Sequence, residues 1–361
     1  MPDLGARLAH VTSSGGYRAE VFRRIPAVLT ALALGSVVLV APLPGAAQAA
    51  RPAASPAPRK APSVRVLAIS LDGFNPAVLK KLGRAKTPNL HRLIDDGAST
   101  LNARSQVELT ITLPNHTSMV TGRRIKAAQG GHGVTWNTDR AGTTVQKAAG
   151  HPVGSVFSAV HGAGLTTGLF ASKTKFSLFK RSWPAGIDRT VIKEERDAQL
   201  ATAVRNDLVK RHRDFTFLHL GGADHAGHTY GWMSAKYRTV VRRLDRLVGL
   251  ILTAHDRHPA LDDLVIILTA DHGGVPGTKN HSDRTAFADY RVPFVVWGAG
   301  VADADLYALN PKYRNPQRRQ PGAKGTQPIR NGNVANLACD LLGVPHVAGS
   351  LFGAKHPLRV N

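Results

Sequence analysis

Short apolar runs and longer amphipathic segments alternate along most of the chain. Residues 64–71, 215–220 and 264–269 are short runs in which most side chains are apolar. Such runs are typical of strands that are buried on both faces of a parallel sheet. Similar patterns predict further strands at residues 99–103, 107–111, 166–171 and 292–297.

The segments between these runs carry apolar residues at helical spacing. The clearest covers residues 234–254, where Tyr237, Val241, Leu244 and Val248 lie on one apolar stripe. Further helices are predicted after residue 87 and at residues 153–164, 198–211 and 334–342. The alternation predicts an α/β fold, a doubly wound, mostly parallel sheet with helices on both faces, formed by one domain over residues 64–361.

The pattern changes within the stretch around Thr112. Residues 107–111 alternate apolar and polar side chains, which predicts a strand that ends near Thr112. Pro114 fits the first turn of a helix, so a helix is predicted to begin near Asn115. The Thr112 hydroxyl would then face the positive end of a helix dipole, which attracts anions. A helix-capping threonine without further function is the alternative interpretation.

The N-terminal region has a different composition. Arg18, Arg23 and Arg24 precede an apolar run from Ile25 to Val40, and small residues with an Ala-x-Ala pattern follow. This order predicts a secretory signal peptide over residues 1–49, with an uncleaved membrane anchor as the alternative. Residues 50–63 are rich in proline and alanine and are interpreted as an extended linker. We therefore expect a secreted or extracellular protein, free or on the cell wall, without stable membrane insertion after cleavage.

The chain is strongly basic, with 47 Lys and Arg against 24 acidic residues and a net charge of +23. Such a charge favours polyanions and predicts weak contact with anionic cell-wall polymers. The basic residues are dispersed except on the predicted helix at residues 238–246 and in the acid-free stretch 311–330. Because no set of aromatic residues interleaves with them, we favour scattered charge over specific nucleic-acid recognition. The single cysteine, Cys339, excludes an internal disulfide.

Three predicted strands are followed closely by an aspartate. Asp72 follows residues 64–71, Asp224 follows residues 215–220, and Asp271 follows residues 264–269. In a doubly wound fold the carboxyl ends of the strands face one crevice. We therefore expect these three carboxylates to lie close together, with Thr112 at the same edge.

Histidines accompany two of these aspartates. His228 follows Asp224, and His272 and His281 follow Asp271. Carboxylate oxygens and imidazole nitrogens suit Zn2+, with Mn2+ or another divalent ion as the alternative. Six such ligands exceed the need of one tetrahedral ion and suit a pair, which can clamp the attacking and leaving oxygens of a displacement at phosphorus.

With these residues in place, the chain resembles the alkaline phosphatase superfamily, and within it the type I phosphodiesterase/nucleotide pyrophosphatase branch. The matching segments are Leu71–Phe74, Thr112–His116, His132–Val134 with Asn137, Asp224–His228 and Asp271–Gly273.

The resemblance implies an alkaline phosphatase-like catalytic domain that holds two Zn2+. One ion would be bound by Asp72, Thr112, Asp271 and His272, and the other by Asp224, His228 and His281. Thr112 would be the nucleophile and Asn137 would bind a phosphoryl oxygen. A phosphate-ester small molecule or a nucleotide would be cleaved at a phosphodiester or pyrophosphate bond through a phospho-threonine intermediate.

Some alternatives stay open on sequence grounds. His281 follows Asp271 more closely than in the larger family members, so His346 and His356 compete with it as the third ligand of the second ion. A phosphomonoesterase or phosphonate hydrolase on the same site is the competing enzyme. A non-catalytic, basic polyanion-binding protein that keeps the fold is the competing hypothesis from another class.

Overall fold

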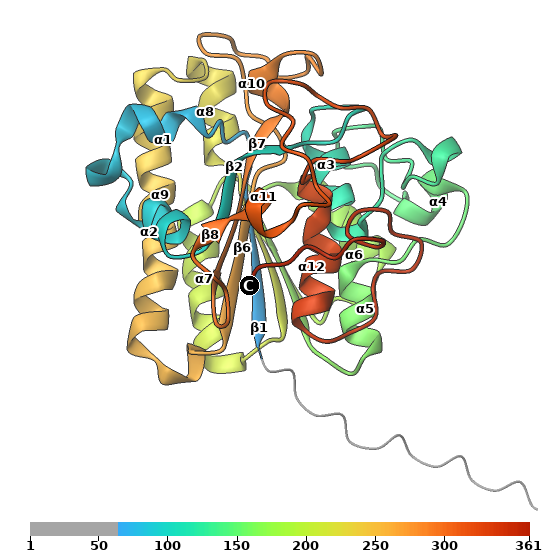
Figure 1. Cartoon of the computed structure of the whole chain (residues 1–361). Helices are drawn as coiled ribbons and strands as arrows, with labels where there is room; N and C mark the ends of the chain where they lie inside the picture. Colours follow the sequence, from blue (N-terminus) through green and yellow to red (C-terminus); the bar gives the residue numbers. More distant parts are fainter. Residues whose placement is uncertain (1–63) are drawn as a thin grey trace, which may run out of the picture. The chain divides into compact units, whose positions relative to one another are not determined.

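Figure 1 shows the computed structural model of the chain, which describes residues 64–361. The predicted signal peptide (residues 1–49) and linker (residues 50–63) lie outside the described residues. Within residues 64–361, no helix combines the length and the apolar character that a membrane crossing requires.

A mixed eight-stranded sheet forms the centre of the described region, in the order β4-β3-β5-β1-β6-β7-β2-β8. The strands are β1 (Arg65–Leu71), β2 (Ala98–Arg104), β3 (Thr167–Ala171), β4 (Arg189–Ile192), β5 (Phe215–Leu220), β6 (Leu264–Thr269), β7 (Arg291–Gly298) and β8 (Ala304–Asp305). β1 pairs in parallel with β5 on one side and with β6 on the other. Only β7 runs antiparallel to its neighbours, so the predicted mostly parallel sheet is confirmed.

Helices cover both faces of this sheet. On one face, α9 (Ala235–Arg257) packs against α2 (Pro88–Asp95), α7 (Asp197–Arg211) and α8 (Gly222–Tyr230). On the other face, α12 (Val334–Leu341) packs against α3 (Thr112–Thr121) and α5 (Val156–Gly162). The two layers are visible to the left and right of the sheet in Figure 1.

The remaining helices are short. They are α1 (Ala77–Leu82), α4 (Val145–Ala149), α6 (Ser177–Ser182), α10 (Phe287–Tyr290), α11 (Leu306–Leu309), η1 (Arg84–Lys86), η2 (Ala127–Gln129), η3 (Thr174–Phe176), η4 (Pro259–Leu261) and η5 (Asn331–Asn333).

The three central strands are buried along their whole length, which explains their apolar sequences. Every residue of β1, β5 and β6 is buried. β5 and β6 have the bounds that their sequences predict, because continuous apolar runs end where the chain leaves the core. The carboxyl ends of these adjacent strands meet at one edge of the sheet, where Asp72 and Asp271 follow directly.

The predicted strand at residues 107–111 is wrong. This segment is irregular, and α3 begins at Thr112 rather than near Asn115. The buried side chain of Asn115 accepts a hydrogen bond from Gln106 N at 2.8 Å and donates to Leu109 O at 2.8 Å. Since side chains satisfy this backbone, the segment needs no neighbouring strand, and Thr112 occupies the first position of a helix instead of the last position of a strand.

Candidate active site

Three loops at one edge of the sheet bring the predicted carboxylates together. Asp72 and Asp271 follow the neighbouring strands β1 and β6, and Gly73 N donates a hydrogen bond to Asp271 Oδ1 at 3.1 Å. Gly73 has a φ of 67°, and a Cβ there would lie 2.7 Å from the Cα of Asp224. Glycine at this position therefore lets the first turn of α8 approach the loop that carries Asp72.

Trp232 packs against two of these loops. Its indole is fully buried and donates a hydrogen bond from Nε1 to Gly73 O at 2.9 Å. A Cβ on Gly274 would lie 2.2 Å from this ring, so only glycine allows the loop after β6 to pack on it. One side chain thus contacts both the loop after Asp72 and the loop after His272.

The Nε2 atom of His272 lies among the three carboxylates. It is 3.2 Å from Asp271 Oδ2, 3.5 Å from Asp72 Oδ1 and 3.8 Å from Asp224 Oδ1. Asp72, Asp271 and His272 form one group that could hold a metal ion. These are the Asp and His residues predicted for the first ion.

A second group lies next to the first. It contains Asp224, His272 and His281, with His281 Nε2 at 3.7 Å from Asp224 Oδ1. His228 lies one helical turn after Asp224 on α8, with its Nε2 at 3.4 Å from Asp224 Oδ1 and 3.2 Å from His281 Nε2. Asp224, His228 and His281, predicted for the second ion, are therefore brought together, and His272 lies between the two groups.

The hydrogen bonds of this cluster fit a bound cation. Among the described residues, four ligand atoms are buried without any hydrogen-bond partner, namely Asp72 Oδ1, Asp224 Oδ1, Asp271 Oδ2 and His272 Nε2. Buried polar atoms are rarely left unpaired. A divalent ion would satisfy these atoms, which point toward one another.

All three predicted histidine ligands are oriented through their other ring nitrogen. The Nδ1 atoms of His228, His272 and His281 donate to the backbone oxygens of Lys279, Gly273 and Thr110, respectively, at 2.6 to 2.9 Å. This arrangement fixes the tautomer that leaves Nε2 with a lone pair toward the carboxylates. Burial lowers the pKa of His281 to about 3 and also lowers the pKa of His272, so both rings are neutral near pH 7.

The pKa values of two carboxylates in the cluster are shifted in opposite directions. Burial raises the pKa of Asp271 well above its usual value, and the neighbouring charges of Asp72 and Asp224 raise it further. Burial alone would also raise the pKa of Asp72, but Lys173 and His219 outweigh it and hold this pKa well below its usual value. Without another cation nearby, three charged carboxylates at these distances repel one another, so the cluster favours bound positive charge.

Two residues that contact the cluster were not predicted from the sequence. Lys173 Nζ lies 2.7 Å from Asp72 Oδ2 and 2.6 Å from Asp224 Oδ2. His219 Nε2 donates to Asp72 Oδ2 at 2.8 Å. Lys173 follows β3 by two residues, so the rule that identified the aspartates could have identified it as well.

Thr112 is buried at the first position of α3, and Asn137 reaches the same helix end. Asn137 Oδ1 accepts hydrogen bonds from Leu113 N at 2.9 Å and from Lys175 Nζ at 3.2 Å. In the described part of the chain, neither the Thr112 hydroxyl nor Asn137 Nδ2 forms a hydrogen bond. Both groups are free to contact a ligand at the helix N-terminus.

Four further histidines form their hydrogen bonds outside the cluster. His116 is buried, with Nδ1 donating to Thr112 O at 2.8 Å and Nε2 accepting from Ser70 Oγ at 2.8 Å, and its Nδ1 lies 3.6 Å from Asp271 Oδ2. His132 bonds Ser118 Oγ at 3.0 Å. His346 Nε2 pairs with Asp340 at 2.6 Å, and His356 lines a cavity with Lys312 and Tyr313. Neither of the two rivals belongs to the metal-ligating groups of the described residues.

A cavity of about 410 Å³ adjoins the cluster. Asp224, His228 and Lys173 line one side, and Glu194 and Glu195 line another. Its volume suits a small organic molecule.

The sequence profile described as "Type I phosphodiesterase / nucleotide pyrophosphatase" matches residues 66–327. The chain is 29% identical over 285 residues to human ectonucleotide pyrophosphatase/phosphodiesterase family member 7, which covers 73% of this chain and 57% of that protein. It is 29% identical over 143 residues to GPI ethanolamine phosphate transferase 1 of Saccharomyces cerevisiae, covering 37% of this chain and 14% of that protein. The chain thus spans little more than half the length of the first of these relatives.

Solved structures share the fold at low sequence identity. Murine ectonucleotide pyrophosphatase/phosphodiesterase 5, as an inactive Thr-to-Ala variant in complex with AMP, gives a TM-score of 0.58 at 14% identity, covering 78% of this chain and 96% of that chain. A 2-O glycosaminoglycan sulfatase gives a TM-score of 0.55 at 15% identity, covering 83% of this chain and 74% of that chain. The doubly wound, alkaline phosphatase-like architecture is confirmed.

Proposed function

Because this chain belongs to the type I phosphodiesterase/nucleotide pyrophosphatase family, we propose that it is a di-zinc hydrolase of phosphodiester or nucleotide pyrophosphate bonds. The observation that carries the proposal is the set of four unpaired ligand atoms of Asp72, Asp224, Asp271 and His272. They lie at the sheet edge where a buried threonine begins a helix.

The two ions would be held as the resemblance implies. Asp72, Asp271 and His272, with the Thr112 oxygen, would bind one, and Asp224, His228 and His281 would bind the other. When bound, the ions would supply positive charge to the oxygens at phosphorus. Lys173 would hold the second oxygens of Asp72 and Asp224, so that the first oxygen of each stays directed at the ions.

Thr112 would be the nucleophile. Its hydroxyl oxygen would attack phosphorus, the bond from phosphorus to the leaving oxygen would break, and the hydroxyl proton would pass through solvent to the leaving group. The phosphoryl group, with its remaining ester substituent, would stay on Thr112. Water would then attack phosphorus, break the Thr112 ester and return a proton to the hydroxyl. The backbone N–H of Thr112 and Asn137 Nδ2 would donate to the non-bridging oxygens, because Leu113 N already donates to Asn137 Oδ1 and Pro114 has no N–H.

Two relatives support these roles. The murine structure combines a loss of activity with a Thr-to-Ala change and contains AMP, a nucleotide monoester that a nucleotide pyrophosphatase would release. The human relative is named as a nucleotide pyrophosphatase/phosphodiesterase. For this chain, nucleotides are accordingly the first substrates to test.

One observation favours the competing phosphomonoesterase. Lys175 Nζ donates to Oδ1 of Asn137, the residue that would bind a phosphoryl oxygen. A monoester dianion carries more negative charge at phosphorus than a diester, so this lysine would favour it. Comparing the hydrolysis of a diester and a monoester separates the phosphodiesterase from the phosphomonoesterase.

We further propose that the protein acts outside the cell after removal of residues 1–49. Its predicted export and its strongly basic composition suit an environment with anionic wall polymers.

The test is hydrolysis of bis-(p-nitrophenyl) phosphate beside p-nitrophenyl phosphate, with chelator and after addition of zinc. Diester hydrolysis that chelator removes and zinc restores supports the proposal, and a strong monoester preference supports the phosphomonoesterase.

In the Asp271→Asn variant, metal content and turnover should fall together. Retention of two metals per chain by this variant would assign the ligand role to another residue, and turnover that chelator leaves intact would refute a metal-dependent hydrolase.

A further inference from the structure

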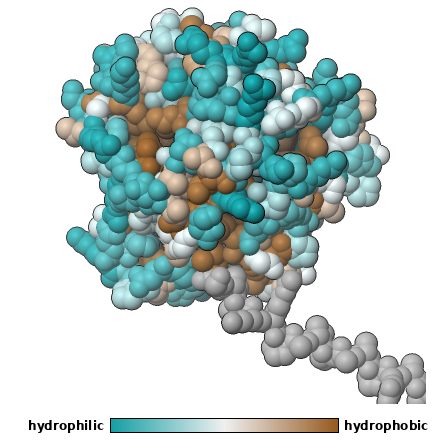
Figure 2. Space-filling model, viewed as in Figure 1, coloured by the Kyte–Doolittle hydropathy of each residue, from teal (hydrophilic) through white to brown (hydrophobic). Residues whose placement is uncertain are grey.

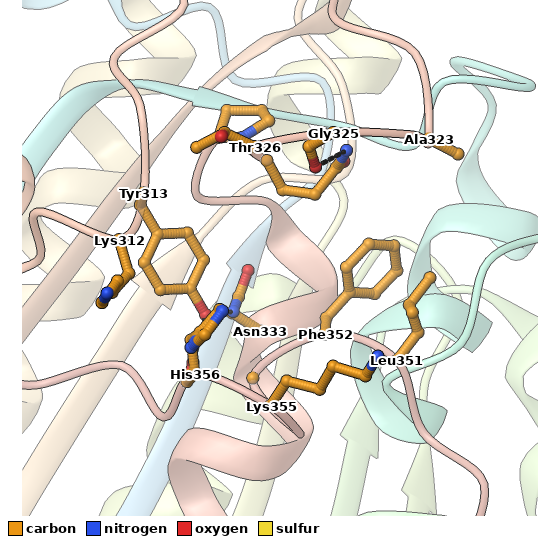
Figure 3. Close-up of a pocket in the computed structure, with 13 residues that line it drawn as sticks. Lys312, Tyr313, Ala323, Gly325, Thr326, Asn333, Leu351, Phe352, Lys355 and His356 are labelled. Atoms are coloured by element: carbon orange, nitrogen blue, oxygen red, sulfur yellow. Dashed lines mark hydrogen bonds between the residues drawn. The ribbon is translucent and has the colours of Figure 1, made fainter.

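Three adjoining cavities lie along the C-terminal part of the chain. The first has a volume of about 560 Å³ and is drawn in Figure 3, where Tyr313 and Phe352 lie on opposite sides of Asn333. It shares Thr326 with a second cavity of about 640 Å³, and it shares Lys312 and His356 with a third of about 350 Å³. Because neighbouring cavities share lining residues, they adjoin one another, and we call this row of three cavities the groove.

Only basic charges line this groove. Five exposed cations border it, and the residues that line the three cavities include no Asp or Glu. The five are Lys312, Arg314, Arg319, Lys355 and Arg359. None of them forms an ion pair with any residue that the structure describes. Their charges are therefore available to an external partner.

Two buried arginines hold the basic loop, residues 311–330, in position. Arg104 donates from Nη2 to Gln317 O at 2.6 Å and from Nε to Arg319 O at 2.8 Å. Arg330 donates from Nη2 to Pro321 O at 2.6 Å. Burial lowers the pKa of both guanidinium groups to about 10, so both stay charged near pH 7. The loop is thus anchored by further positive charge, and the groove exists before a partner binds.

We propose that this groove binds a linear phosphate polymer that lacks bases. A row of adjoining cavities bordered by five cations matches a chain with repeated negative charge, because each cation can meet one phosphate. The proposal adds a binding surface to the proposed hydrolase and does not depend on turnover.

The walls of the groove argue against the two other polyanionic partners. Nucleic acids without sequence recognition are bound through exposed aromatic faces, whereas Phe352 is buried and Tyr313 is half-buried. A lipid bilayer needs a protruding apolar surface, whereas this site is concave and Leu351 is its single exposed large hydrophobic side chain among the described residues. On the face drawn in Figure 2, hydrophilic residues interrupt the hydrophobic areas.

The experiment measures binding of fluorescently labelled linear inorganic polyphosphate by anisotropy, with the full chain in chelator so that no metal-dependent turnover occurs. The groove variant is Lys312→Ala/Lys355→Ala/Arg359→Ala. The control variant is Lys80→Ala/Lys81→Ala/Lys86→Ala, which removes equal charge from exposed lysines on α1 and η1.

The groove variant should bind at least about tenfold more weakly, and its plot of log affinity against log salt should be shallower by about 2, as three lost phosphate contacts predict. The control variant should bind within about twofold of the wild type. Equal weakening in both variants would overturn the proposal in favour of non-specific net charge. Tighter binding of single-stranded DNA or of phosphatidylglycerol vesicles would overturn it in favour of that partner.

Zinc-dependent hydrolysis of a small ester separates the two proposals. The groove variant should retain it, because none of its three residues belongs to the predicted active site. If the groove variant loses polymer binding but keeps hydrolysis, the groove proposal is supported. If the wild-type chain binds the polymer but does not hydrolyse the ester, the groove proposal is supported and the hydrolase is refuted.

Discussion

At the scale of single residues, Lys173 explains how two carboxylates can be buried next to each other. Its ammonium group contacts Asp72 and Asp224, which belong to the two different predicted metal-binding groups. Burial alone would lower the pKa of Lys173, but these two carboxylates outweigh it and raise the pKa above its ordinary value. The lysine therefore stays charged and reduces the repulsion within the cluster.

We expect Lys173→Met to destabilise the metal-free protein by about 3 kcal/mol, because removal of one partner leaves buried charge uncompensated. Zinc should restore much of the loss, since a divalent ion supplies the missing positive charge. The measurement is denaturant unfolding with chelator and with zinc. Lys126→Met, at an exposed lysine, is the control. Equal destabilisation in both conditions would instead assign Lys173 a packing role.

At the scale of elements, the sequence predicted best the strands that are buried on both faces of the sheet. β5 and β6 match their predicted bounds, and α7 and α12 begin or end within one residue of theirs. The edge strand β4 was not predicted, because its four residues are only half-buried and carry no apolar run. Burial on both faces, rather than strand propensity, is what the apolar pattern reports.

The segment before α3 escaped prediction for a different reason. Its alternating pattern is real, but hydrogen bonds from distant residues decide its conformation. Thr110 Oγ1 donates to His281 O at 2.6 Å, and His281 Nδ1 donates to Thr110 O at 2.6 Å. No local pattern encodes contacts between residues 171 positions apart in the chain. The same contacts bring a predicted metal ligand to the loop before Thr112.

We expect Asn115→Leu to destabilise the protein by about 3 kcal/mol or more, because buried backbone groups such as Gln106 N and Leu109 O lose their partners. Thermal and denaturant unfolding measure this loss. Asn206→Leu, on the exposed side of α7, should change stability by less than about 0.5 kcal/mol. Similar effects of the two changes would show that Asn115 does not fix this segment.

At the scale of the whole molecule, the predicted ligands come from segments that are far apart in the chain but adjacent in the sheet. Asp72 and Asp271 are separated by almost 200 residues, yet their strands are neighbours. The sequence could predict this convergence, since the carboxyl ends of parallel strands share one edge. The same rule could have identified Lys173, which follows β3 by two residues. It could not predict the basic groove, because that depends on how loops fold back on the sheet.

One carboxylate outside the predicted metal cluster, that of Asp289, makes the free energy of unfolding depend on pH. Burial raises the pKa of Asp289 on α10 to about 7, and Asp289 Oδ1 is buried without a hydrogen-bond partner among the described residues. Because the folded state binds this proton more tightly than the unfolded state, the contribution stabilises the protein below pH 4. It is lost as the pH rises from about 4 to about 7.

Asp289→Asn should therefore stabilise the protein relative to the wild type at pH 8 and have little effect at pH 4. At about 1.4 kcal/mol per pKa unit, the difference between the two pH values should be on the order of 2 to 4 kcal/mol. Denaturant unfolding of both proteins across this range measures it. A difference that does not change with pH would mean that Asp289 titrates normally in the folded state.

The central claim is that Thr112 attacks phosphorus beside a metal cluster, and trapping the covalent intermediate tests it most directly. The zinc-loaded protein is mixed with bis-(p-nitrophenyl) phosphate, quenched in acid during turnover and digested, and the peptide that contains Thr112 is analysed by mass spectrometry. We expect a p-nitrophenylphosphoryl ester on Thr112 in the wild type and none in Thr112→Ala, which should retain its metal with reduced affinity. Unchanged turnover by Thr112→Ala, or an ester on a different residue, would contradict the account.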